Sequence, residues 1–175
     1  MDNDLTKPNF GWIGIFRLGL VQAALGAIVI LTTSTLNRVM VVELVLPATL
    51  PGALVGWHYA VQLSRPRWGY GSDVGGARAP WIIGGMITLA LGAIAAAGST
   101  MLMETSATWG ILGAIVAFFF IGVGVGAAGT NMLALLATHT APARKAAAAA
   151  ITWIMMIIGF IVTAGVAGAM LEPFS

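Results

Sequence analysis

Long apolar runs fill most of this chain, and the polar stretch 65–80 separates two of them. A helix crosses the apolar core of a bilayer with about 20 residues, and charged side chains are costly at that depth. The stretch contains Arg65, Arg67 and Arg78, three of the eight basic residues. We therefore predict that the apolar runs cross a membrane and that residues 65–80 lie outside it.

The composition agrees with this prediction. Of the 175 residues, 59% are hydrophobic and only 8% are charged, whereas soluble domains carry about 25% charged residues. We predict an all-α membrane protein, a polytopic helical bundle that forms a single transmembrane domain over residues 1–175 and does not bind nucleic acid. The absence of cysteine excludes disulfides, thiolate metal sites and cysteine nucleophiles.

About five transmembrane helices fit the pattern of apolar runs. Their approximate bounds are 16–42, 48–63, 81–102, 109–138 and 146–170.

Basic residues near span ends predict the orientation, because they collect on the cytoplasmic side. With a cytoplasmic amino terminus, every basic residue except Arg38 lies on that side, from Lys7 onward. Arg38 then lies on the far side together with Glu43, Glu104 and Glu172. We predict this orientation, in which five spans place the carboxyl terminus outside.

Small residues four positions apart predict close contact between helices, because they allow two backbones to approach within a membrane. Gly122 and Gly126 form one such pair, and Ala164 and Gly168 form another.

No catalytic constellation is visible in the sequence. It has no serine elbow, no phosphate-binding loop and no cluster of metal-ligating residues. We therefore predict that the protein is not an enzyme and has no metal site.

A polar stripe in the first predicted span is the first candidate site. Gln22, Thr33 and Asn37 recur at helical spacing, with Arg38 beside them, and polar groups inside a membrane are functional candidates. One interpretation is that the stripe lines a cavity. The alternative is that Arg38 extends to the outer interface, where it pairs with Glu43.

His58 in the second predicted span is the other candidate. Trp57 and Tyr59 flank it, and Gln62 follows one turn later. A neutral imidazole can ligate a metal ion, including the magnesium of a chlorin ring, and adjacent aromatic residues suit a flat macrocycle. The alternative is a histidine that makes an ordinary hydrogen bond to a neighbouring helix.

The polar stretch resembles the loop signature of the major facilitator superfamily. The residues that carry the resemblance are Gly69, Asp73, Gly76 and Arg78. The resemblance implies that the glycines allow close helix approach, that the acid lies at a helix amino terminus, and that basic residues pair with nearby acids. Val74 and Ala77 stand at positions that are often basic in the superfamily.

A narrower resemblance covers nearly the whole chain. Residues 31–44, 58–62, 67–73 and 153–157 are similar to the PucC/LhaA group, the bacteriochlorophyll-delivery branch of this superfamily in purple phototrophic bacteria. The Gly-Tyr-Gly-Ser-Asp form of the loop is most similar to the branch named for a bacteriochlorophyll synthase chain. Superfamily members have about twelve spans, so five spans correspond to part of an amino-terminal half.

This resemblance implies an accessory membrane protein that binds or delivers bacteriochlorophyll and assists the assembly of light-harvesting or reaction-centre complexes. The implied cofactor is bacteriochlorophyll. The implied partners are membrane lipids, light-harvesting or reaction-centre subunits and pigment-synthesis enzymes. The implied location is a bacterial inner, or intracytoplasmic, membrane. Two alternatives stay open: a transporter of a small solute, which the polar stripe favours, and a structural subunit of a mature photosynthetic complex.

Overall fold

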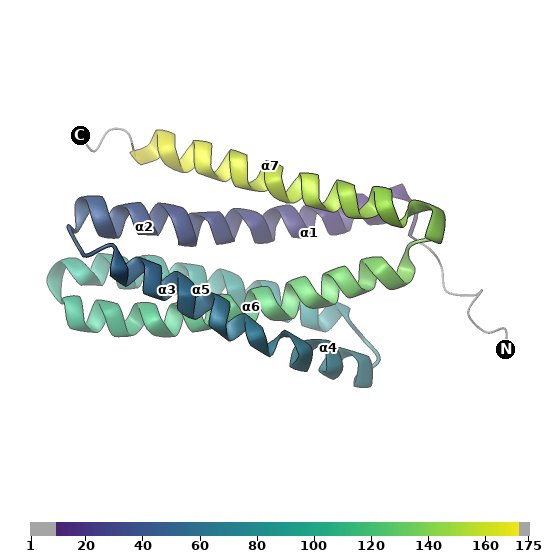
Figure 1. Ribbon diagram of the computed structural model, residues 1–175, viewed down its shortest axis with the longest axis horizontal. Coiled ribbons are helices and arrows are strands. Elements are labelled where there is room, and N and C mark those ends of the chain that lie inside the picture. Colours follow the sequence, from purple (N-terminus) through teal and green to yellow (C-terminus); the bar gives the residue numbers. More distant parts are fainter. Residues whose placement is uncertain (1–9, 172–175) are drawn as a thin grey trace.

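The computed structural model describes residues 10–171, which fold into helices packed side by side along one long axis (Figure 1). The described residues contain no strand, which confirms the prediction of an all-α protein. Successive passes of the chain run in opposite directions, and α1 begins at the opposite end of the bundle from the end of α7 (Figure 1).

The first pass is one continuous helical segment with two widened turns. Its parts are α1 Trp12–Ile30, the π-helical turn η1 Leu31–Thr35, α2 Leu36–Arg38 and the π-helical turn η2 Val39–Glu43. The hydroxyl of Thr32 donates to the carbonyl of Ile28 at 2.9 Å, and that of Thr33 donates to the carbonyl of Val29 at 2.7 Å. Such side chains compete for backbone carbonyls and bend helices, which accompanies the departure from α geometry at η1.

The second pass is built differently from the prediction. The helix α3 Thr49–Val61 continues through one 3-10 turn, η3 Gln62–Ser64, into α4 Arg65–Val74. Most of the stretch 65–80, which the sequence analysis placed in a loop, is therefore helical. Pro66 lies in the first turn of α4, where proline favours the start of a helix because no backbone N–H bond is lost.

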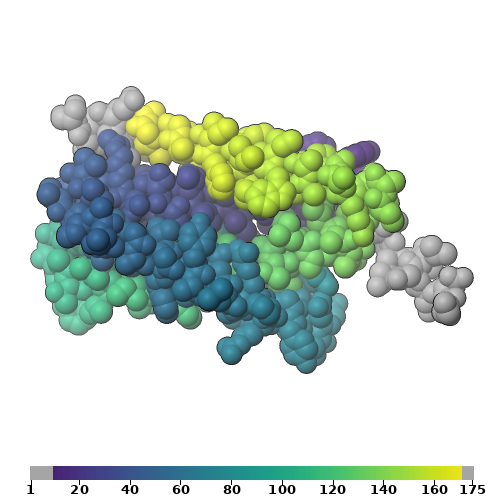
Figure 2. Space-filling model, in the orientation of Figure 1, coloured from purple at the N-terminus to yellow at the C-terminus, as the bar shows by residue number. Residues whose placement is uncertain are grey.

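The remaining passes form a hairpin and an outer helix. The hairpin consists of α5 Ala79–Thr105 and α6 Ala107–His139, joined by Ser106 in an extended conformation. A 3-10 turn, η4 Pro142–Arg144, leads into α7 Lys145–Leu171. Figure 2 shows α7 along the outside of the molecule, at the upper edge of this view.

Four helical segments of the described chain are long and apolar enough to cross a membrane. They are Trp12–Glu43, Ala79–Thr105, Ala107–His139 and Pro142–Met170. The predicted span 48–63 corresponds to α3, whose 13 residues extend only about 20 Å at 1.5 Å per residue. The chain is thus a multi-pass membrane protein, but the count of five spans is not confirmed.

The backbones of α5 and α6 lie in close contact along the hairpin. A Cβ atom placed on Gly124 would lie 2.6 Å from the amide nitrogen of Leu89 and 2.7 Å from the carbonyl oxygen of Gly85. A Cβ atom placed on Gly92 would lie 3.0 Å from the amide nitrogen of Ile121. Leu89 and Ile121 are fully buried, so this seam forms the centre of the main core.

Of the two predicted pairs of small residues, only one lies at a helix contact. A Cβ atom on Gly122 would lie 2.7 Å from the carbonyl oxygen of His58 in α3, and one on Gly126 would lie 3.3 Å from Trp68 in α4. In contrast, Ala164 is exposed, and open space surrounds the Cβ position of Gly168. The second pair therefore makes no close helix contact within the described part of the chain.

A second seam joins α1 to α7. A Cβ atom on Gly26 would lie 3.0 Å from the carbonyl oxygen of Met156. Near the start of α1, the amide of Phe10 donates to the carbonyl of His139 at 2.6 Å, and Arg144 donates to the carbonyl of Phe10 at 3.3 Å. These bonds tie the first helix to the turn between α6 and α7.

The ends of the bundle differ in charge. The described basic residues other than Arg38 lie in α1, in α4, directly before α5, in η4 and at the start of α7, and these segments meet at one end (Figure 1). Arg38 lies toward the other end with Glu43 and Glu104. This separation agrees with the predicted topology, but the side that faces the cytoplasm stays a prediction. Lys7 and Glu172 lie outside the described residues.

Substitution of Gly124 by alanine is expected to destabilise the protein by about 1–3 kcal/mol, because the added methyl group meets backbone atoms that cannot move aside alone. Gly98→Ala is the matched control on the same hairpin, since nothing lies within 4 Å of its Cβ position, and it should be neutral or stabilising. Thermal unfolding in detergent measures both. A Gly124→Ala protein as stable as the wild type would contradict the described seam.

A strained residue, Val45, with a φ of 52°, lies in the connection that follows the first pass. A β-branched side chain in this left-handed conformation costs about 1–2 kcal/mol, and glycine removes that cost while adding about 0.5–1 kcal/mol of unfolded-state entropy. Val45→Gly should therefore raise the melting temperature by about 1–4 °C. Val42→Gly, within the helical η2, should lower it. A lower melting temperature for Val45→Gly would show that Val45 is not strained.

Candidate functional site

The predicted polar stripe does not converge on one site. Gln22 is buried and donates to the sulfur of Met156 in α7 at 3.2 Å, whereas the hydroxyl of Thr33 is bound to the backbone of its own helix. Asn37 is half-buried and Arg38 is exposed. The four side chains thus have separate environments, and a cavity lined by them stays a prediction.

One observation is consistent with the alternative interpretation, in which Arg38 extends to the outer membrane interface. Its side chain is exposed, as extension to the interface requires. Arg38 and Glu43 both lie in the described part of the chain, and no ion pair joins them.

His58 is fully buried between α3 and α6. Its Nε2 lies 2.8 Å from the amide nitrogen of Gln62, and the guanidinium of Arg65 donates to the amide oxygen of Gln62. The bond from Arg65 fixes the orientation of the amide, so the amide nitrogen donates to Nε2 and the proton of the neutral ring lies on Nδ1. Nδ1 is buried and has no hydrogen-bond partner.

The hydrogen bonds among His58, Gln62 and Arg65 leave the imidazole without a free nitrogen lone pair for a metal ion. The one nitrogen with a lone pair already accepts a bond from Gln62, and the ring has no exposed surface. Trp57 and Tyr59 are 42% and 58% exposed, whereas His58 is fully buried with its ring centroid 4.7 Å from that of Tyr59, edge to face. A pigment site formed by these three residues stays a prediction.

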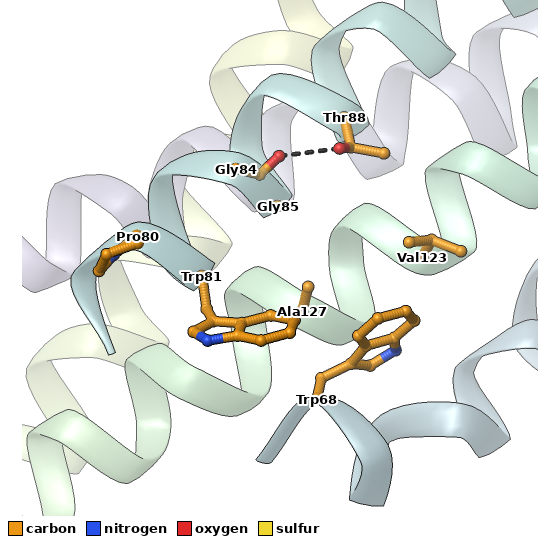
Figure 3. Close-up of a pocket in the computed structure, with 8 residues that line it drawn as sticks. All are labelled: Trp68, Pro80, Trp81, Gly84, Gly85, Thr88, Val123 and Ala127. Atoms are coloured by element: carbon orange, nitrogen blue, oxygen red, sulfur yellow. Dashed lines mark hydrogen bonds between the residues drawn. The ribbon is translucent and has the colours of Figure 1, made fainter. Parts of the chain in front are cut away.

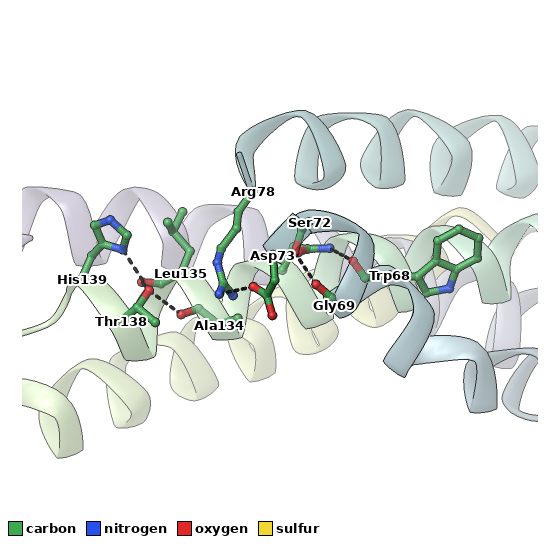
Figure 4. A network of polar contacts seen from close by, with 10 residues as sticks. Trp68, Gly69, Ser72, Asp73, Arg78, Ala134, Leu135, Thr138 and His139 are labelled. Atoms are coloured by element: carbon green, nitrogen blue, oxygen red, sulfur yellow. Dashed lines mark hydrogen bonds and ion pairs between the residues drawn. The ribbon is translucent and has the colours of Figure 1, made fainter. Parts of the chain in front are cut away.

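The loop motif closes the turn between α4 and α5. Arg78 donates to Oδ1 of Asp73 at 2.6 Å (Figure 4). Gly76 adopts a φ of 66°, which favours glycine. The Cβ position of Gly69 lies 3.5 Å from Thr130 of α6. Asp73 lies in the last turn of α4, and its partner Arg78 immediately precedes α5, so contact of the acid with a helix amino terminus stays a prediction. The motif shapes the turn and presents no cavity.

An open furrow with a volume of about 520 Å³ lies between the α3–α4 segment and α6. We call it the aromatic furrow. It is lined by Trp57, Ala60, Val61, Ser64, Arg67, Trp68, Phe119 and Val123.

The aromatic walls of the furrow are held in place by hydrogen bonds. The rings of Trp57 and Phe119 stack with centroids 6.4 Å apart and planes inclined by 27°. The indole N–H of Trp57 donates to the carbonyl of Ile115 at 3.2 Å, and that of Trp68 donates to the hydroxyl of Ser64 at 3.0 Å. These bonds leave the flat, apolar faces of the indole rings as contact surface.

Two smaller hollows adjoin the furrow. One, of about 300 Å³, shares Trp68 and Val123 with it, and Figure 3 shows the indole rings of Trp68 and Trp81 beside this space. Another, of about 320 Å³, shares Trp57 and continues along α3 toward Leu50. Together they extend the apolar surface on both sides of the furrow.

Sequence reasoning missed the furrow because its residues come from different helices. Trp68 stands at a predicted span end, where an indole ring is common at the membrane interface. Phe119 lies in a run of three phenylalanines, a pattern typical of a lipid-facing helix. Only the packing of α3 against α6 brings Trp57, Trp68 and Phe119 together.

Comparison with known proteins places the chain within one family. The model of the family described as PUCC protein matches residues 35–175. The chain is 56% identical over 165 residues to the bacteriochlorophyll synthase 44.5 kDa chain of Rhodobacter capsulatus, which covers 94% of this chain and 39% of that protein. It is 32% identical to protein PucC of Rhodovulum sulfidophilum, over 91% of this chain and 38% of that protein.

The protein PucC of Rhodobacter capsulatus is 29% identical, again over 38% of its length. The chain therefore spans about two fifths of the length of these curated relatives. No solved structure matches the chain, so the relation to the major facilitator fold stays an expectation.

His58→Leu should lower the stability of the protein by about 1–3 kcal/mol, because it leaves the buried amide of Gln62 without its acceptor. Tyr59→Leu, at an exposed neighbouring position, should change stability by less than about 0.5 kcal/mol. The double variant His58→Leu, Gln62→Leu should recover part of the loss. Melting temperatures in detergent measure all three, and an unchanged value for His58→Leu would contradict the described hydrogen bond.

Proposed function

Because the chain belongs to the PucC family, we propose that it is an accessory membrane protein that binds or delivers bacteriochlorophyll. In this role it assists the assembly of light-harvesting or reaction-centre complexes. Its place is the inner, intracytoplasmic membrane of a phototrophic bacterium, with the amino terminus in the cytoplasm. Its partners are membrane lipids, subunits of those complexes and enzymes of pigment synthesis.

The observation that carries this proposal is the family match over residues 35–175. A relative at 56% identity has bacteriochlorophyll in its name, which supports a pigment-related role. The chain covers only 39% of that relative, so the activity of the longer protein is part of the proposal. The aromatic furrow adds support, because an apolar surface with flat ring faces suits an apolar, planar ligand.

The proposed role is binding and transfer rather than catalysis. The word synthase in the name of one relative describes that protein. In this chain the sequence analysis found no nucleophile with an adjacent base and no pair of acids in one span, which are the arrangements that covalent and acid–base catalysis use.

A transporter of a small polar solute is the second candidate. The observation that favours it is the position of Thr33, Asn37 and Arg38 on and beside the π-helical turns η1 and η2, since such turns are frequent at functional sites. Solute uptake into proteoliposomes that falls on substitution of Arg38 would support this candidate.

The leading proposal predicts that the protein, purified in mild detergent from a phototrophic bacterium, carries near-infrared absorbance of bacteriochlorophyll or co-purifies with photosynthetic subunits. Absorption spectra and mass spectrometry of the purified fraction measure both. A membrane protein of similar size from the same cells, purified in the same way, is the control for adsorbed pigment. Absence of both pigment and photosynthetic partners would contradict the proposal.

A further inference from the structure

We propose that the aromatic furrow, rather than His58, is the site that holds the magnesium tetrapyrrole. This inference rests on the proposed function and assigns it a place in the molecule. The furrow has a volume of about 520 Å³, and it opens on the outer surface between α3 and α6, where a ligand dissolved in the bilayer can enter sideways.

The shape of the furrow suits a flat ring with a long apolar tail. The rings of Trp57 and Phe119 stack on each other with planes inclined by 27°, and both side chains keep about two fifths of their surface exposed, against which a planar macrocycle can stack. Its volume of about 520 Å³ lies within the usual range for small-molecule sites. The adjoining hollows next to Leu50 and next to Trp81 offer continuous apolar surface for a tail.

The polar groups of the furrow complement those of the pigment. Arg67 is exposed and forms no ion pair within the described part of the chain, so its N–H donors are available. Bacteriochlorophyll carries carbonyl groups at the rim of its ring, and these accept hydrogen bonds. Because Arg67 lies at one end of the furrow, its hydrogen bonds to these carbonyl groups favour one orientation of the macrocycle.

An oxygen donor is also present. The hydroxyl of Ser64 donates to the carbonyl of Val61 at 2.6 Å and accepts a bond from Trp68, which leaves one lone pair on the oxygen. Oxygen ligands suit magnesium. His58 offers no comparable group, because its accepting nitrogen is occupied by Gln62 and its ring is sealed under α6.

The test is titration of the purified protein with bacteriochlorophyll in detergent, with affinity measured from tryptophan quenching and the shift of the near-infrared band. Val123→Trp fills the junction between the furrow and its neighbour and should weaken binding at least about tenfold. Val116→Trp is the matched control, because this exposed valine of α6 lies outside the furrow, and its affinity should be unchanged.

Three further variants, one of them a control, keep the test decisive if Val123→Trp does not fold. Arg67→Gln, at an exposed position, should weaken binding about threefold to tenfold, as expected for the loss of one ordinary hydrogen bond, whereas Lys145→Gln should not. His58→Leu should retain pigment in the fraction that stays folded.

The outcomes separate this inference from the proposed function. Wild-type protein that binds no bacteriochlorophyll overturns both. Wild-type protein that binds pigment, with loss on His58→Leu and no loss on Val123→Trp or Arg67→Gln, overturns only the assignment to the furrow and returns the ligand to His58.

Discussion

The structure depends on the contact between α5 and α6, where glycines replace side chains and let two backbones meet. At Gly85, Gly92 and Gly124 an added Cβ atom would collide with backbone atoms of the opposite helix. In lipid, helices gain little from the hydrophobic effect on association, so this close packing supplies the attraction. The resulting hairpin is the rigid surface on which the rest of the chain rests, since α3 and α4 contact α6 on one side while α1 carries α7 on the other.

The position of α3 on this hairpin decides what each of its side chains can do. Gly122 admits the backbone of α3 at His58, which seals the imidazole inside and leaves Trp57 on the outside. The same contact brings Trp57 beside Phe119 and opens the furrow next to it. Burial of a polar cluster and exposure of an aromatic surface are thus two consequences of one packing contact, and the aromatic surface is the one that a membrane-soluble ligand can reach.

Composition and periodicity predicted the helical class and the approximate helix bounds, because apolar runs of this length are typical of membrane-spanning helices. The loop signature implied close helix approach at Gly76, whereas open space surrounds its Cβ position and its positive φ marks a turn. The helix α4 was missed because its polar residues suggested a loop, although Pro66 is a normal first-turn residue. The furrow could not be predicted from the sequence, since Trp57 and Phe119 are neighbours only after α3 packs on α6. The role of His58 depends on which ring nitrogen accepts the hydrogen bond from Gln62, and no sequence pattern indicates that.

The most direct test of this account is an experimental structure of the protein loaded with bacteriochlorophyll. The account predicts the macrocycle between α3 and α6, against Trp57 and Phe119, with His58 still bound to Gln62 and Gly122 still in contact with α3. A structure in which α3 has separated from α6 and the imidazole of His58 ligates the magnesium would contradict it.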